Sequence, residues 1–178
     1  MTTVFTVGHS SRSLEELVGL LREHGIDALV DVRRFPHSRT NPQFDEERLA
    51  PILAAAGITY LVAPALGGRR GRKDSSEDAI ALQSGWEVAA FRAYAAYATT
   101  AAFREALSAL EDLASRSRCA LMCSEALWWR CHRRIVADYL LAAGVRVRHI
   151  LGPGELQEGA LTPFAREGTD GTLLYGPA

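Results

Sequence analysis

Short apolar segments that favour strands alternate along this chain with longer segments whose apolar residues recur at helical spacing. The strand-like segments are rich in β-branched and aliphatic residues and cover 3–8, 26–32, 58–62, 119–123 and 145–151. Strands joined through helices run parallel in one sheet, because each helix returns the chain to the end from which it started. The pattern therefore predicts an α/β fold, with a mainly parallel five-stranded sheet covered by helices on both faces.

Helix-start signals support this alternation. Ser13 followed three residues later by Glu16 has the spacing of a capping box, in which two side chains satisfy free backbone N–H groups at the helix end. Ser84 and Glu87 have the same spacing and predict another helix start. Asp45 is a typical N-cap residue, and we expect it to begin the helix before the third strand. Further helical stripes predict helices at 103–113 and 132–143.

The length of 178 residues is that of one compact domain. We expect its core to span 3–151 and to be followed by a loop-rich tail, 152–178. That tail holds six of the fifteen glycines and three of the seven prolines, so we expect it to be irregular, with one short strand at 172–175.

The composition excludes several classes of protein. The formal net charge of −1 argues against a surface that attracts nucleic acid or membranes as a whole, so any anion site must be local. The chain shows no secretory signal and no apolar run of membrane-spanning length. Three cysteines in such a chain favour reduced thiols and a cytoplasmic location.

Polar and basic residues follow the predicted strands at their carboxyl ends. The segments 33–39, 69–73 and 130–134 hold ten of the twenty lysines and arginines, although the chain as a whole is nearly neutral. In open parallel sheets, ligands bind outside the carboxyl ends of the strands, where these loops converge. The sequence therefore predicts a basic pocket at this edge of the sheet.

Reactive side chains are concentrated in "ALMCSEALWWRCHRR", residues 120–134, and after the first two strands. Cysteines offer a nucleophile, carboxylates a base and histidines an acid. Structural roles compete with each of these, since a cysteine in a strand is commonly a core residue and a strand-end Asp–Arg pair commonly forms an internal ion pair. The candidate catalytic residues are His9, Asp31, Cys123, Glu125, Cys131 and His132.

Cys131 is expected at a helix N-terminus beside Arg130 and Arg133, where the helix dipole and the cations favour a thiolate. Adjacent helical residues point about 100° apart. We therefore expect His132 not to face Cys131, and to work instead with His9, Asp31 or Glu125 on neighbouring loops.

Ligand contacts are expected from basic and aromatic side chains of the same loops. Guanidinium groups bind phosphate through paired hydrogen bonds, and an exposed tryptophan can stack on a nucleobase, although tryptophans in such loops more often cover the edge of a core. The candidate ligand-binding residues are Ser10, Arg33, Arg69, Arg130, Arg133 and Trp129.

Standard cofactor motifs do not occur. The glycines do not form G-x-G-x-x-G after the first strand, and no phosphate-binding G-x-x-x-x-G-K-[ST] is present. A zinc site from Cys123, Cys131, His132 and His9 would need an unusual ligand spacing, so we predict no metal and no cofactor. A disulfide between Cys123 and Cys131 is possible if the loop between them folds back far enough.

The chain resembles the bacterial and archaeal family named Domain of Unknown Function 488. The resemblance rests on "TVGHSSRS", "LVDVRRFPHSR", "LGGRR", "FRAYAAYATTAAFREAL" and "ALMCSEALWWRCHRRIVADYLLAAGVRVRHI", and it covers about 4–151. It implies a single α/β domain and no particular activity. The shared motif residues that it implies are His9, Ser10, Asp31, Arg33, Cys123, Glu125, Cys131, His132 and Arg133.

Three functions remain open from the sequence. The leading hypothesis is an enzyme acting on a phosphate-bearing ligand, either a nucleotide or nucleic acid. The second is a non-catalytic module that binds nucleic acid or a phosphorylated ligand, and the third is a thiol- or metal-dependent sensor. We expect no membrane partner, and the sequence does not fix the oligomeric state.

Overall fold

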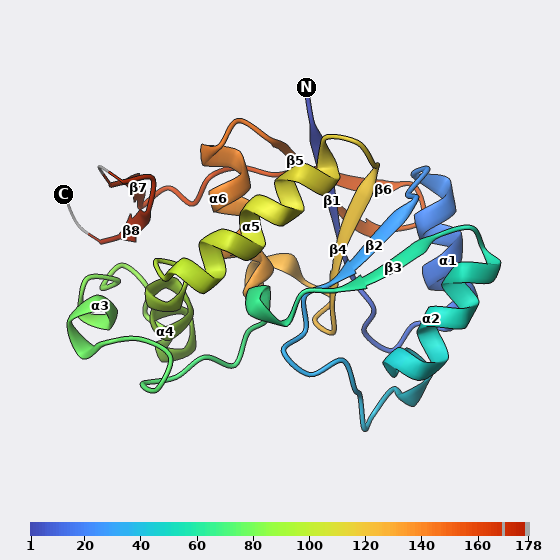
Figure 1. Cartoon of the computed structure of the whole chain (residues 1–178), viewed down its shortest axis with the longest axis horizontal. Coiled ribbons are helices and arrows are strands. Elements are labelled where there is room, and N and C mark those ends of the chain that lie inside the picture. The colour runs from blue at the N-terminus through green and yellow to red at the C-terminus, as the bar shows by residue number, and fades with distance from the viewer. Residues whose placement is uncertain (169, 177–178) are drawn as a thin grey trace.

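The computed structural model describes residues 1–168 and 170–176, and it confirms the α/β fold (Figure 1). Five parallel strands form the sheet, with a sixth, antiparallel strand at one edge, in the order β3-β2-β4-β1-β5-β6. The strands are β1 (Thr3–Gly8), β2 (Ala28–Asp31), β3 (Thr59–Val62), β4 (Cys119–Cys123), β5 (Arg146–Gly152) and β6 (Glu155–Glu158).

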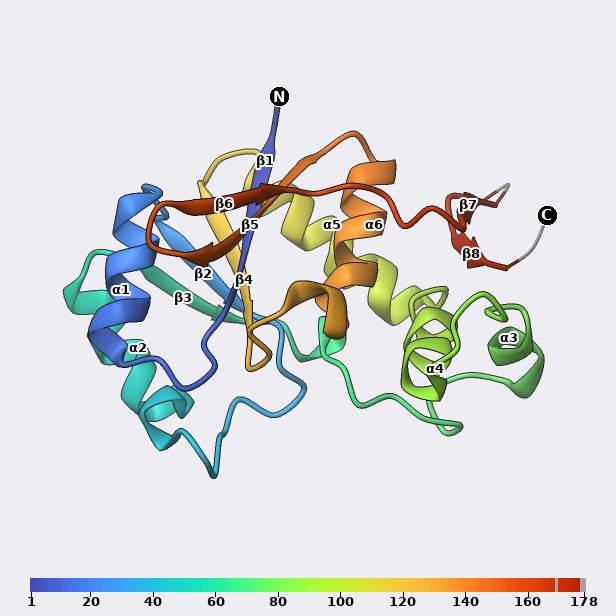
Figure 2. The ribbon, with the colours of Figure 1, turned by 180° about the vertical axis from the view of Figure 1, so that it is seen from behind.

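Helices cover both faces of this sheet (Figures 1 and 2). The helices are α1 (Leu14–Glu23), α2 (Glu46–Ala55), α3 (Glu77–Ala81), α4 (Ala89–Tyr97), α5 (Ala101–Ala114) and α6 (Arg133–Ala142). Short 3-10 turns are η1 (Pro42–Phe44), η2 (Pro64–Leu66) and η3 (Trp128–Arg130). Among the helices described, none is long and apolar enough to span a bilayer.

Side chains alternate between the two faces along each strand and form two cores. Phe5 and Met122 pack with α1 and α2, whereas Leu121 and Val147 pack with α5 and α6. Burial of each such side chain stabilises the fold by about 1.5–3 kcal/mol. Cys123 belongs to the second core, so its side chain points toward α5 and α6.

The strand order places a topological switch point between β1 and β4. These strands are neighbours although β2 and β3 come between them in the sequence. α1 leaves β1 over one face and α6 leaves β4 over the other, so the loops beyond the two strands diverge there. Ligands of open α/β sheets bind at such a point.

The predicted helix starts are partly right. Ser13 and Glu16 form the expected capping box on α1. Asp45 is the N-cap of α2, but its carboxylate accepts the N–H of Ser38 at 2.7 Å and not an N–H of the helix. This bond ties the loop after β2 to the start of α2.

The predicted capping box at Ser84 and Glu87 is wrong. Ser76 caps the short helix α3 instead, and α4 begins only at Ala89. The intervening segment is held by the end of the chain, because Gly85 donates its N–H to the carbonyl of Tyr175 at 2.7 Å. The contact between Gly85 and Tyr175 thus outweighs the local helix-start preference of Ser84 and Glu87.

The tail is more ordered than we predicted. It contributes β6 to the sheet edge, and its β7 (Ala165–Glu167) and β8 (Leu173–Tyr175) form a two-stranded antiparallel sheet. β8 lies within the strand predicted at 172–175. The Tyr175 hydroxyl donates to Asp138 of α6 at 3.0 Å, and its backbone N–H donates to Gln83 at 3.1 Å. Both views show this small sheet beside α3 and α4 (Figures 1 and 2).

Candidate functional site

A cavity of about 980 Å³ lies where the loops after β2, β3 and β4 meet α4. This is the carboxyl edge at which the sequence predicts a pocket. Its charged and reactive lining residues are Arg33, Arg34, His37, Arg39, Arg69, Cys123, Glu125, Arg130, Cys131 and His132. Five arginines thus face one glutamate, and the cavity carries a positive charge that the whole chain does not.

Two cysteines in this lining stand in direct contact. Cys123 is the last residue of β4, and Cys131 lies between η3 and α6, yet their Sγ atoms are 2.9 Å apart. The connecting loop folds back through η3, in which Cys131 donates its N–H to the carbonyl of Trp128 at 3.2 Å. Both cysteines are buried and neither is in a disulfide.

Backbone contacts at Gly8 hold this loop against β1. The N–H groups of His9 and Ser10 donate to the carbonyls of Cys123 and Ser124, at 2.9 and 3.1 Å. A Cβ atom on Gly8 would lie 2.0 Å from the carbonyl oxygen of Glu125. The glycine is therefore required for the close approach that places Cys123 at the cavity.

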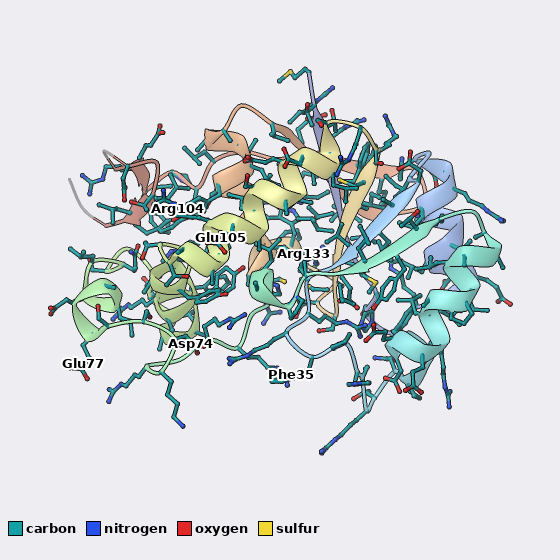
Figure 3. The ribbon with its side chains drawn as sticks, in the orientation of Figure 1. Phe35, Asp74, Glu77, Arg104, Glu105 and Arg133 are labelled. Carbon is teal, nitrogen blue, oxygen red and sulfur yellow. The ribbon has the colours of Figure 1, made fainter. Side chains whose placement is uncertain are left out.

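Arg133 lies in the interior of the molecule (Figure 3) and is not among the residues that line the cavity. Its side chain is only 1% exposed. Nε donates to Cys123 Sγ at 3.0 Å, Nη1 donates to the hydroxyl of Thr6 at 3.3 Å, and Nη2 donates to the carbonyl of Glu125. The geometry makes Arg133 the counter-charge of the sulfur atoms, whereas we had expected it to bind the ligand directly.

Cys131 has the environment of a thiolate. Its Sγ is 3.5 Å from His132 Nδ1 and accepts the backbone N–H of Arg133 at 3.4 Å. Burial acts to raise the pKa of the Cys131 thiol, but the hydrogen bond from Cys123, together with His132 and Arg133, outweighs it and holds that pKa well below its ordinary value.

Cys123 has the opposite character. Burial, and then the hydrogen bond and negative charge of Cys131, raise the pKa of the Cys123 thiol well above its usual range. The pair therefore consists of one thiolate and one thiol, with the Cys123 proton shared toward Cys131.

His132 faces Cys131, and the prediction that it would not is wrong. The prediction assumed that both residues are helical, but Cys131 has extended backbone angles (φ −128°, ψ 153°) and α6 begins only at Arg133. His132 Nε2 lies 3.0 Å from the carbonyl of Val32, which only accepts, so Nε2 carries a proton. Nδ1 is therefore the ring atom left to accept the Cys131 proton.

The His132 ring is fixed on its other sides as well. A Cβ atom on Gly68 would lie 2.8 Å from Nδ1, so only glycine lets the loop after β3 pack on the ring. The ring of Tyr94 lies at a centroid distance of 5.2 Å, and its hydroxyl donates to the carbonyl of Leu66 at 2.6 Å. A nucleophile with an oriented base is the arrangement found in cysteine-dependent catalysis.

Asp31 is held in a buried ion pair outside the cavity. Arg33 Nε donates to Asp31 Oδ1 at 2.9 Å, Nη2 donates to Oδ2 at 2.5 Å, and the hydroxyl of Tyr60 donates to Oδ2 at 2.6 Å. The internal ion pair that competed with a catalytic role is thus present. Arg33 itself still lines the cavity through its remaining surface.

His9 belongs to the same buried cluster. It stacks on Phe44 with ring centroids 4.2 Å apart, donates from Nδ1 to the carbonyl of Ser10 at 2.9 Å, and accepts from Arg33 at 3.4 Å. Burial lowers the pKa of His9 to about 4, although the bond to Ser10 acts in the opposite direction. His9 is therefore neutral near pH 7 and does not line the cavity.

Three arginines of the cavity are available to a ligand. In the described part of the chain, the guanidinium groups of Arg39, Arg69 and Arg130 have no hydrogen bond, ion pair or ring contact. Arg69 has a left-handed backbone (φ 56°), which is uncommon for a residue other than glycine. Arg34, by contrast, is engaged by Asp74 at 3.4 Å.

Glu125, Trp128 and Trp129 lie in three different environments. Glu125 lines the cavity and its Oε1 accepts the N–H of Leu127 at 3.1 Å. Trp128 stacks on His149 at a centroid distance of 4.1 Å and so covers the core. Trp129 is 40% exposed and lines a second cavity of about 540 Å³, which shares Arg130 and Phe91 with the first.

The structure thus brings together part of the predicted set. Cys123, Glu125, Cys131 and His132 share the cavity with Arg33, Arg69 and Arg130, whereas His9, Ser10, Asp31 and Arg133 do not line it. Sequence reasoning missed Thr6 and Tyr94, for which the signal was a polar residue within a buried strand and a tyrosine on the apolar stripe of a helix. Among the residues the structure describes, no three acidic, histidine or cysteine side chains are arranged to hold a metal ion.

The comparison with family models gives one match. The model described as Domain of unknown function DUF488 matches residues 13–140, which include both cavity cysteines and His132. Searches of curated proteins and of solved structures return no match.

Proposed function

Because the chain belongs to the family Domain of unknown function DUF488, whose description gives no activity, we propose a function from the site itself: a cysteine-dependent enzyme acting on a phosphate-bearing ligand. The observation that carries this proposal is the contact of Cys131 Sγ with His132 Nδ1 at 3.5 Å, in the lining of an arginine-rich cavity. A nucleophile and an anion site occupy the same space.

The cavity arginines support an anionic substrate. Guanidinium groups bind phosphate oxygens through two parallel hydrogen bonds, and Arg39, Arg69 and Arg130 have none of their donors committed within the described structure. Glu125 is the only carboxylate among the cavity residues, so the field inside favours a negative ligand. Of the three uncommitted cavity arginines, Arg130 is the nearest in sequence to the nucleophile.

The chemistry assigned to the pair is nucleophilic substitution. His132 Nδ1 holds the proton given up by Cys131, and the Cys131 thiolate attacks the electrophilic centre of the bound ligand. The bond to the leaving group then breaks, and the leaving group departs with the proton from His132. Water then attacks the thiol-linked intermediate, its proton passes to His132 Nδ1, and the bond to sulfur breaks, which releases the Cys131 thiolate. Arg133 serves as a positioning residue, since it acts on the ligand only through the sulfur atoms.

A nucleotide fits the two cavities better than a simple phosphate does. The second cavity is bordered by Trp129, Phe91, Trp86 and Phe164, and it meets the first at Arg130. A planar base can stack on aromatic rings while its phosphates lie beside the arginines. We therefore propose a nucleotide or the end of a nucleic acid as the substrate.

We expect nucleoside di- and triphosphates to bind the reduced protein and Arg130→Ala to weaken that binding at least about tenfold, the usual scale for the loss of a charged hydrogen bond. Cys131→Ser should bind equally well but lose turnover. Titration calorimetry measures the binding, and anion-exchange chromatography of the nucleotides measures the turnover.

Arg116→Ala is the matched control, because Arg116 is exposed and follows α5 at the other end of the sheet. Equal turnover by Cys131→Ser and wild type would remove the cysteine from the mechanism. Binding without turnover in the wild type would instead favour the non-catalytic binding module.

A further inference from the structure

The two cavity cysteines are placed to react with each other. Their sulfur atoms are 2.9 Å apart, whereas a disulfide bond measures about 2.05 Å, so small side-chain rotations join them. We propose that Cys131 and Cys123 form a reversible redox pair, in which Cys131 reacts with a peroxide and Cys123 then closes a disulfide. This activity does not depend on the proposed nucleotide chemistry.

The contacts of Cys131 make it the sulfur that reacts first. It receives the backbone N–H of Arg133 at 3.4 Å and faces His132 Nδ1 at 3.5 Å, and both groups favour the thiolate. A thiolate, and not a thiol, is the form that peroxides oxidise. Cys131 also lines the 980 Å³ cavity, through which a small oxidant reaches it.

The contacts of Cys123 make it the resolving partner. It is held by Arg133 Nε at 3.0 Å and by the N–H of Glu125 at 3.4 Å. While Cys131 is a thiolate, its negative charge opposes ionisation of Cys123. Oxidation of Cys131 to a neutral sulfenic acid removes that opposition, and Arg133 then favours the thiolate of Cys123. The second step is thus enabled by the first.

The atoms balance with hydrogen peroxide as the oxidant. The Cys131 sulfur attacks one peroxide oxygen, the O–O bond breaks, and the departing hydroxide takes a proton and leaves as water. Cys123 then loses its proton and attacks the sulfenic sulfur, the S–O bond breaks, and a second water leaves. Two thiols lose two electrons, and the peroxide gains them. A small dithiol reverses the reaction by exchange.

The third cysteine provides an internal control. Cys119 begins β4, is buried, and does not line the cavity. Burial raises the pKa of its thiol to about 11, so it stays protonated near neutral pH. Cys119 should therefore remain reduced while the pair is oxidised.

The test treats the reduced full chain with one equivalent of hydrogen peroxide near neutral pH. We expect free thiols to fall from three to one, and the intact mass to fall by about 2 Da. Peptide mapping should join Cys123 to Cys131, and dithiothreitol should restore all three thiols. Cys119→Ser should give the same bridge, and Cys123→Ser should accumulate a sulfenic acid that dimedone traps at Cys131.

Loss of one thiol or none, or a bridge that contains Cys119, would overturn the proposal. The thiol count and the peptide map need only the wild-type protein, so they decide the proposal even if Cys123→Ser fails to fold. Nucleotide titration of the same reduced sample tests the proposed function separately. A Cys123–Cys131 bridge without nucleotide binding would support the redox pair and contradict the proposed function. Nucleotide binding without the bridge would support the proposed function and contradict the redox pair.

Discussion

Acidification from about pH 7 to pH 4 is expected to destabilise the fold by several kcal/mol, on the order of 3 kcal/mol for each of two buried histidines. Burial lowers the pKa of His9 to about 4, and burial together with the charge of Arg133 lowers the pKa of His149 to about 4. The unfolded chain, with ordinary histidine pKa values near 6.5, binds these protons first. Stability is therefore fully present above about pH 6.5 and falls as the pH drops toward 4.

Urea unfolding at a series of pH values measures this loss of stability. The wild type is compared with variants in which position 9 or 149 carries a side chain that cannot be protonated. His149→Gln and His9→Asn should flatten the dependence, each by roughly half. His37→Gln is the matched control, since His37 is exposed, and it should leave the dependence unchanged. A wild-type stability that is constant between pH 7 and 4 would show that neither histidine is held neutral by the fold.

Arg133→Met is expected to reduce the free energy of unfolding by about 3–5 kcal/mol, because it breaks a buried charge network. The substitution removes the hydrogen bonds that Arg133 donates to the hydroxyl of Thr6, the carbonyl of Glu125 and Cys123 Sγ, and it leaves the two sulfur atoms without a cation. Each unsatisfied buried group costs about 1–3 kcal/mol. The pKa of Cys131 should rise in the same variant, because Arg133 helps to lower it.

Arg146→Met is the control for a surface arginine. Arg146 pairs with Glu158 at 2.7 Å on the exposed edge of the sheet, and exposed ion pairs contribute little to stability because water screens them. Urea unfolding of the two variants compares a buried arginine with an exposed one. Similar losses for both would contradict the role given to Arg133.

Much of the fold follows from the sequence because it rests on local periodicity. The five parallel strands and the Ser13 capping box were predictable, since each depends on the residue types and spacing within one short stretch of sequence. The Ser84 pattern failed because Gly85 pairs with Tyr175, which is ninety residues away. Such a long-range contact cannot be predicted from the residues next to Ser84.

The candidate site was predictable in its place and less so in its roles. The strand ends located the arginine-rich cavity, but the contact of Cys131 with His132 depended on where α6 begins. Asp31 does not line the cavity because it is held in an ion pair to which Tyr60 of the neighbouring strand donates a hydrogen bond. The Arg133 side chain is buried against Cys123 because of the fold of the loop before it. Such details are set by packing between segments.

The pH dependence of alkylation at Cys131 measures whether this sulfur is a thiolate within an anion-binding cavity. Iodoacetamide labelling of the reduced protein, resolved by peptide mass spectrometry, gives separate rates for Cys131 and Cys119. We expect Cys131 to react at pH values well below those at which an ordinary thiol ionises, pyrophosphate to slow that reaction, and Cys119 to stay unlabelled. A Cys131 rate that rises up to about pH 8.5 like that of an ordinary thiol, and is indifferent to pyrophosphate, would contradict it.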